Sequence, residues 1–71
     1  MARQFDVIIE QDPEGYFVAS VPALPGCHTQ AKSLDALMDR IREAIELCIE
    51  VKGMPEEPLN FIGVQRVTVA A

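Results

Sequence analysis

Hydrophobic and polar residues alternate at the beginning of the chain, between Gln4 and Gln11. Phe5, Val7 and Ile9 occupy the odd positions, and two of the positions between and beside them are acidic. A period of two is typical of a strand with one buried face, because successive side chains of a strand point to opposite sides. The pattern therefore predicts a first strand over residues 4–11.

A tight turn is predicted directly after this strand, at residues 12–15. These residues are Asp-Pro-Glu-Gly, and Asp favours the first position of a β-turn, Pro the second, while Gly tolerates a positive φ at the last. The following segment, Tyr16–Val21, is aromatic and β-branched. We expect it to return as a second strand, antiparallel to the first.

Two prolines and a glycine separate this hairpin from the next apolar pattern, in the stretch VPALPGCHTQAKSLDAL that begins at Val21. Pro22 and Pro25 have no backbone amide to donate, and Pro25-Gly26 fits the central pair of a type II turn. The first part of the stretch can therefore be neither helix nor internal strand. A short third strand is predicted over Cys27–Ala31.

A long amphipathic helix is predicted from Leu34 to Lys52. Ser33 is a suitable N-cap residue, and Gly53 is a natural C-terminal cap. Apolar residues recur at spacings of three and four, which places them on one side of a helix that turns by about 100° per residue. We expect this stripe to cover the sheet; its members are Leu34, Leu37, Met38, Ile41, Ile45, Cys48 and Ile49.

The chain is predicted to finish with a connector and a last strand. Pro55 and Pro58 stop the helix from continuing, so residues 53–60 form the connector. In Val64–Ala70, Val67 and Val69 alternate with polar neighbours, as expected of a strand. The predicted fold is α+β in the order βββαβ, one helix on a small, largely antiparallel sheet, and residues 1–71 form a single domain.

Length and charge limit the kinds of function. A chain of 71 residues buries only about 60% of its unfolded surface, so we expect a homodimer or higher homo-oligomer to add burial. No apolar run is long enough for a membrane span, and the acids near the N-terminus exclude a signal sequence, so we expect a cytoplasmic protein. The net charge of −5 argues against direct nucleic-acid binding and suits a basic protein partner.

The adjacent Cys27 and His28 are the first candidates for catalysis. Neighbours on a strand point to opposite faces, so the histidine cannot activate the thiol, and we expect a buried cysteine beside an exposed histidine. One histidine and two cysteines are too few for a typical zinc site, and no Gly-rich phosphate loop is present. The sequence predicts no catalytic, metal-binding or cofactor-binding residue and therefore no enzyme.

Acidic residues gather on the helix side opposite the apolar stripe. They fall within about 80° of one another and are Asp35, Asp39, Glu43, Glu46 and Glu50. One interpretation is a solvated face; the other is a docking surface for a basic partner, whose approach the acids would accelerate. Leu47 lies beside the acids, either as a single exposed leucine or as an anchor of an interface.

Several of these motifs together resemble the HicB-type antitoxin domain. They are the run DPEGYFVASVPALPGC, then Thr29, then Ser33-Leu34-Asp35, then the helix motif IREAIE. The resemblance spans nearly the whole chain and implies a partial ribonuclease H-like βββαβ fold without nuclease activity. It also implies an antitoxin that binds and blocks a HicA-like toxin, a small basic ribonuclease that uses a histidine to cleave mRNA.

The chain departs from the family pattern in places. Ala31 and Lys32 stand where the family often has Gly and an acid, and Ala36 replaces a common Glu. Many members continue into a DNA-binding module, whereas this chain ends at Ala71, so we expect a stand-alone member. Two other functions stay open: an orphan homo-oligomeric scaffold without a toxin, and a degenerate nuclease, whose metal-dependent RNA cleavage would be abolished by Asp6→Asn.

Overall fold

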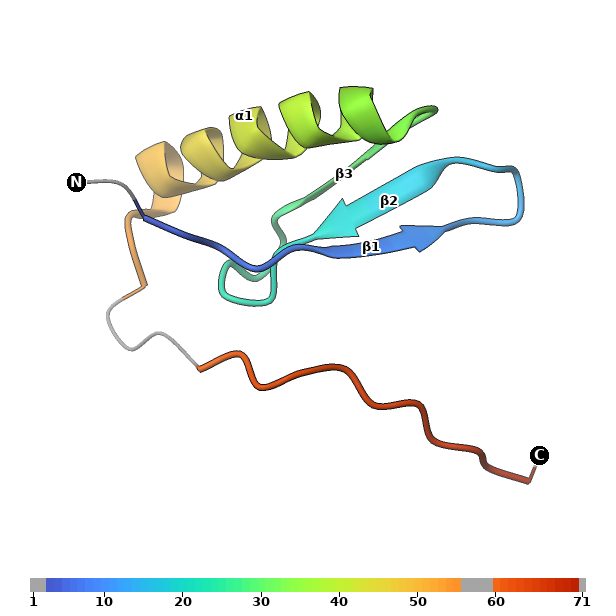
Figure 1. The fold of residues 1–71 in the computed structure, drawn as a ribbon. Coiled ribbons are helices and arrows are strands. Elements are labelled where there is room, and N and C mark those ends of the chain that lie inside the picture. Colours follow the sequence, from blue (N-terminus) through green and yellow to red (C-terminus); the bar gives the residue numbers. More distant parts are fainter. Residues whose placement is uncertain (1–2, 56–59, 71) are drawn as a thin grey trace.

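Three antiparallel strands followed by one helix make up the fold (Figure 1). The computed structural model describes residues 3–55 and 60–70. The strands form one sheet in the order β1-β2-β3, and the helix follows the third strand. The α+β class, with one helix on a small antiparallel sheet, is confirmed; the elements are β1 (Ile8–Gln11), β2 (Phe17–Ser20), β3 (His28–Ala31) and α1 (Leu34–Lys52).

Each strand is shorter than the alternation predicted. The β1–β2 ladder begins at the pair Ile8 and Ser20. The next residue of the second segment, Val21, directs its amide to the carbonyl of Cys27, 3.1 Å away, and its own carbonyl accepts from the amide of Leu24 at 3.0 Å. Because the chain turns away there, residues 4–7 are left without a neighbouring strand.

Both predicted turns are present, and side chains or glycines fix them. The Asp12 carboxylate accepts from the amides of Glu14 and Tyr16 at 2.9 Å, and Gly15 adopts a φ of 93°. In the second turn the amide of Cys27 donates to the carbonyl of Leu24 at 2.9 Å, and Gly26 has a φ of 82°. A positive φ at the third residue is the mark of a type II turn, which confirms the Pro-Gly prediction.

The helix begins and ends where its capping residues predicted. The Ser33 hydroxyl accepts from the Ala36 amide at 3.2 Å, which satisfies one of the free donors of the first turn. At the other end, Gly53 has a φ of 79° and its amide donates to the carbonyl of Ile49 at 2.7 Å. The bounds Leu34–Lys52 are thus confirmed.

The core lies between α1 and two of the three strands. Within the described residues, α1 packs on β3 and β2 and makes no contact with β1. Small side chains on the strands let the helix approach closely, as Ala19 is fully buried and Ala31 nearly so. The buried residues are Ala19, Val21, Leu24, Cys27, Ala31, Leu37 and Ile41.

Two residues of the predicted apolar stripe lie outside this core, so that part of the prediction is wrong. Leu37 and Ile41 are buried, and Ile45, Cys48 and Ile49 pack against the core, but Leu34 is 50% exposed and Met38 39% exposed. Met38 lies on the flank of α1 that extends past β2, where the helix has no strand beneath it. The period of the pattern fixes a direction on the helix, and the width of the sheet decides how much of that side is covered.

The predicted last strand does not form. Residues 60–70, which we call the C-terminal tail, have no strand among the described elements and leave the sheet as one extended trace (Figure 1). Val64, Val67 and Val69 are each about three-quarters exposed. An extended segment becomes a strand only when a neighbour takes up its amides and carbonyls, and the tail has no such neighbour among residues 3–55. The order observed is therefore βββα.

The thiol of Cys27 belongs to the core and stays neutral at physiological pH. Its side chain is 3% exposed, and both it and Cys48 are free cysteines. Burial, with a smaller contribution from its hydrogen bond to Cys48, raises the pKa of the Cys27 thiol from 9.0 to about 11. A protonated thiol is a poor nucleophile.

Replacing Leu37 by alanine is expected to lower the free energy of unfolding by about 3 kcal/mol, because the fully buried side chain would leave a cavity. Leu47→Ala is the matched control: it removes the same atoms from the same helix at a position 59% exposed, and should cost under about 0.5 kcal/mol. Urea denaturation followed by circular dichroism measures both. Equal losses would contradict the assignment of the core.

The raised pKa of Cys27 predicts an alkaline loss of stability. The unfolded thiol releases its proton near pH 9 and the folded one near pH 11, so the unfolded state binds fewer protons in this window. The free energy of unfolding should therefore fall as pH rises from 9 to 11, and be unaffected by this group below pH 8. The free energy of unfolding, measured by urea titration at several pH values in that window, should fall more steeply with pH for wild type than for Cys27→Ala. The same dependence on pH in both proteins would contradict the prediction.

Candidate protein-binding site

The outer side of α1 presents the acidic residues that the sequence singled out. Every predicted member is exposed, and the helix is regular through its 19 residues. They therefore form one row along the helix surface, on the side turned away from the sheet. We call this row the acidic face; it consists of Asp35, Asp39, Glu43, Glu46 and Glu50.

The arginines of the helix border the acidic face. Arg40 turns toward the sheet, where its guanidinium donates to the main-chain carbonyl of Gln30 on β3 at 3.3 Å. Arg42 lines a groove on the opposite flank of α1, together with Met38 and Ile45. The row of carboxylates therefore lies between two flanks that carry the positive charge.

An apolar pair adjoins the acidic face. Leu47 is 59% exposed, which both interpretations of the sequence require, and Val51 is 72% exposed. Residues four apart are neighbours on a helix surface, so the two side chains form a small hydrophobic patch at the C-terminal half of α1. The sequence analysis missed Val51, although its spacing from Leu47 was a usable signal. Acids beside an apolar patch form the kind of surface that a basic protein can dock on.

The pair Cys27 and His28 is separated by the sheet, as predicted. Cys27 is buried under α1, whereas His28 is exposed at the start of β3, opposite Ser20 of β2. With the thiol neutral and the imidazole on the other face, the pair has no geometry for nucleophilic catalysis.

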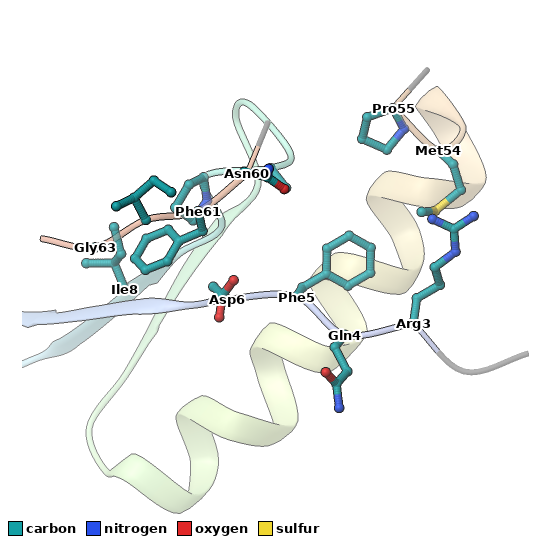
Figure 2. A pocket seen from close by; sticks show the side chains of 13 residues that line it. Arg3, Gln4, Phe5, Asp6, Ile8, Met54, Pro55, Asn60, Phe61 and Gly63 are labelled. Atoms are coloured by element: carbon teal, nitrogen blue, oxygen red, sulfur yellow. The ribbon is translucent and has the colours of Figure 1, made fainter. Parts of the chain in front are cut away.

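Asp6 lies in a hollow of about 480 Å³ between the N-terminal segment and the beginning of the tail. Figure 2 shows Asp6 between Phe5 and Ile8, with Arg3, Met54 and Phe61 also at the walls. Among the described residues that line this hollow, Asp6 is the one acid. Two-metal cleavage of a phosphodiester needs several carboxylates around the ions.

The described part of the chain offers no other reactive centre. Over residues 3–55 and 60–70 there is no group of three or more His, Cys, Asp or Glu side chains that could hold a metal ion. In the same residues, no helix has both the length and the apolar character needed to span a membrane. The acidic face of α1, with its apolar pair, is the candidate functional site.

The chain is similar to known proteins over most of its length. A UPF0150 protein of Archaeoglobus fulgidus is 61% identical over 93% of this chain and 94% of its own length. UPF0150 proteins of Synechocystis and Thermoplasma acidophilum are 43% and 40% identical, and each match covers more than nine-tenths of both chains. Residues 5–64 match the family described as the HicB-like antitoxin of bacterial toxin-antitoxin systems. The chain therefore belongs to the HicB-like antitoxin family.

Proposed function

We propose that this chain neutralises a small basic ribonuclease of the HicA kind by binding it directly through the outer side of α1. The observation that carries the proposal is the acidic face, exposed along a regular helix and bordered by the apolar pair Leu47 and Val51. Membership of an antitoxin family makes a toxin the natural partner for that surface. A toxin that cleaves mRNA works in the cytoplasm, so the proposal places this chain there too.

The charge of the acidic face suits such a partner. A ribonuclease must present cationic side chains to the phosphates of its substrate. A row of carboxylates offers those cations the same negative charge that the phosphates do. Exposed charges act over roughly 8 Å at physiological salt, so they act mainly by guiding the encounter. The chain as a whole, with the acidic face included, has a net charge of −5.

The apolar pair supplies what the charges cannot. Binding energy at protein interfaces concentrates in a few apolar or aromatic anchors that lose their water, while rim charges contribute little affinity. Leu47 and Val51 project one turn apart from the C-terminal half of α1, beside the acids, so a partner that covers the acids there also covers them. We therefore assign the encounter rate to the carboxylates and the residence time to Leu47.

Exchanging Glu43 and Glu46 for glutamine should slow association with the toxin. The partner is first identified by co-purification with the small basic protein encoded beside this chain. At low salt the association rate constant should fall about threefold to tenfold, and its dependence on salt should flatten, because two rim charges are lost. Stopped-flow or surface plasmon resonance measurements at two salt concentrations give both quantities.

The matched control for this pair is Glu10→Gln with Glu14→Gln. It removes the same two charges from exposed positions on the β1–β2 hairpin, away from α1. A small general effect of net charge is expected there. Equal rates and equal salt slopes for both double variants and wild type would show that the acidic face is only solvated and that the toxin docks elsewhere.

Leu47→Ala should weaken the complex by about tenfold, through a faster dissociation rate, because an anchor of the interface is removed. Leu34→Ala is the control on the same helix, since Leu34 is 50% exposed but lies in the first turn, outside the apolar pair. Its effect on dissociation should be under about twofold. If both substitutions left dissociation unchanged while the complex still formed, Leu47 would not be the anchor.

A further inference from the structure

We infer that two copies of this chain exchange their C-terminal tails, each tail adding as a fourth strand to the free edge of β1 in the other copy. The occupant of that edge is thus a second copy, and its contributing segment is residues 60–70. The inference is independent of the toxin proposal.

The tail is an apolar segment without a partner. Phe61, Ile62, Val64, Val67 and Val69 are all exposed, and Ile62 reaches 93%. In its second half the two valines share one side of the extended chain, while Arg66 and Thr68 share the other. One apolar side and one polar side are typical of a strand that covers a core with one face.

The chain exposes more surface than a compact monomer of its size. Its accessible area is 6187 Å², whereas a folded monomer of 7.8 kDa has about 4,400 Å². The radius of gyration is 13.7 Å against about 11 Å for a compact chain of this length. The excess of about 1,800 Å² is more than the ~800 Å² that each partner buries in a standard stable interface. The excess exposed area is therefore large enough for an interface with a second copy.

The outer edge of β1 is open. The amide of Asp12 donates to the carbonyl of Tyr16 at 2.9 Å, and bonded and unbonded residues alternate along an antiparallel ladder. With the register given, Ile8 and Glu10 bond to β2, whereas Ile9 and Gln11 direct their amides and carbonyls away from it. No strand lies on that side among the described residues.

The outer edge of β3 is partly obstructed by a side chain of the helix. The same alternation, counted from the hydrogen bond between the Val21 amide and the Cys27 carbonyl, turns the main chain of Gln30 outward. That carbonyl already accepts from the guanidinium of Arg40 at 3.3 Å. The helix also packs on β3 and leaves β1 uncovered. Of the two edges, that of β1 is the less obstructed.

An apolar groove lies on the helix side of the sheet, between α1 and the N-terminal segment. It has a volume of about 550 Å³, and its apolar lining consists of Phe5, Met38, Ile41, Ile45 and Ile49. Ile9, 44% exposed, shares the helix side of the sheet with Phe5 by the alternation of β1. A strand added beside β1 with Val67 and Val69 on the helix side would cover Ile9 and fill this groove. Arg66 and Thr68 would then face solvent.

The beginning of the tail is held away from its own groove, which favours exchange over closure within one chain. Phe61 lies beside Ile8 (Figure 2). Phe5 and Val7 pack against the core on the helix side. Successive side chains of an extended chain alternate, so Ile8 points to the opposite face of the sheet. The tail therefore departs from the face away from α1, whereas the groove is on the α1 side. Reciprocal exchange joins each tail to the other copy's groove and closes as a two-fold pair.

The first test is the oligomeric state of Val67→Asp and its control Thr68→Asp. Each places one carboxylate in the same exposed segment, the first on the side expected to be buried and the second on the side expected to face solvent. Sedimentation equilibrium should find wild type and Thr68→Asp as dimers at 50 μM chain, and Val67→Asp as a monomer with a dissociation constant raised at least 100-fold. Circular dichroism should show the same helix content in all three, since Val67 is exposed in the single chain. A monomeric wild type, or a Val67→Asp protein that dimerises like wild type, overturns the inference.

The second test separates exchange from closure within one chain. Full-length chains carrying Ile9→Cys are mixed with differently tagged chains carrying Val67→Cys, then oxidised and run on a non-reducing gel. A heterodimer band several times stronger than in the Ile9→Cys and Thr68→Cys mixture is expected, with Cys27→Ala and Cys48→Ala in every chain to remove the native thiols. A further sample carries Ile9→Cys and Val67→Cys in the same chain, and a disulfide that forms only in that sample overturns the inference. So does a wild type that is monomeric alone and uses the tail only to bind the toxin.

Discussion

The packing of one helix on two strands is the contact on which the rest of the structure depends. An α-helix is about 10 Å wide and neighbouring strands lie about 4.8 Å apart, so a single helix covers two strands and no more. Leu37 and Ile41 make that contact over the small side chains of Ala19 and Ala31. The remaining strand, β1, is therefore left uncovered by the helix. The open edge of β1 and the groove beside it follow from the same limit.

This arrangement divides α1 into sides with separate duties. The side against the sheet holds the fold together, and its substitution changes stability. The outer side carries the acidic face and the apolar pair, none of which contributes to the core. Substitutions on the outer side therefore leave untouched the residues that position the helix.

The sequence predicts best those features whose causes are local. The bounds of α1 followed from Ser33 and Gly53, and the two turns from the residues inside them. The exposed positions of the acidic face followed from the helical period. The exposure of Met38 and the absence of a last strand did not, because both depend on what lies opposite in space. Periodicity states which side of an element is apolar, and only the assembled layers decide whether anything covers it.

Arg40 has an effect that extends beyond its own hydrogen bond. A sheet with two available margins can add molecules end on end without limit, which is how ordered aggregates grow. The guanidinium across the Gln30 carbonyl obstructs one margin of this sheet. In the tail exchange inferred above, strands would then add at the margin of β1, and the two-fold pair would use that margin in both copies. A single long side chain would in this way work against end-on-end growth.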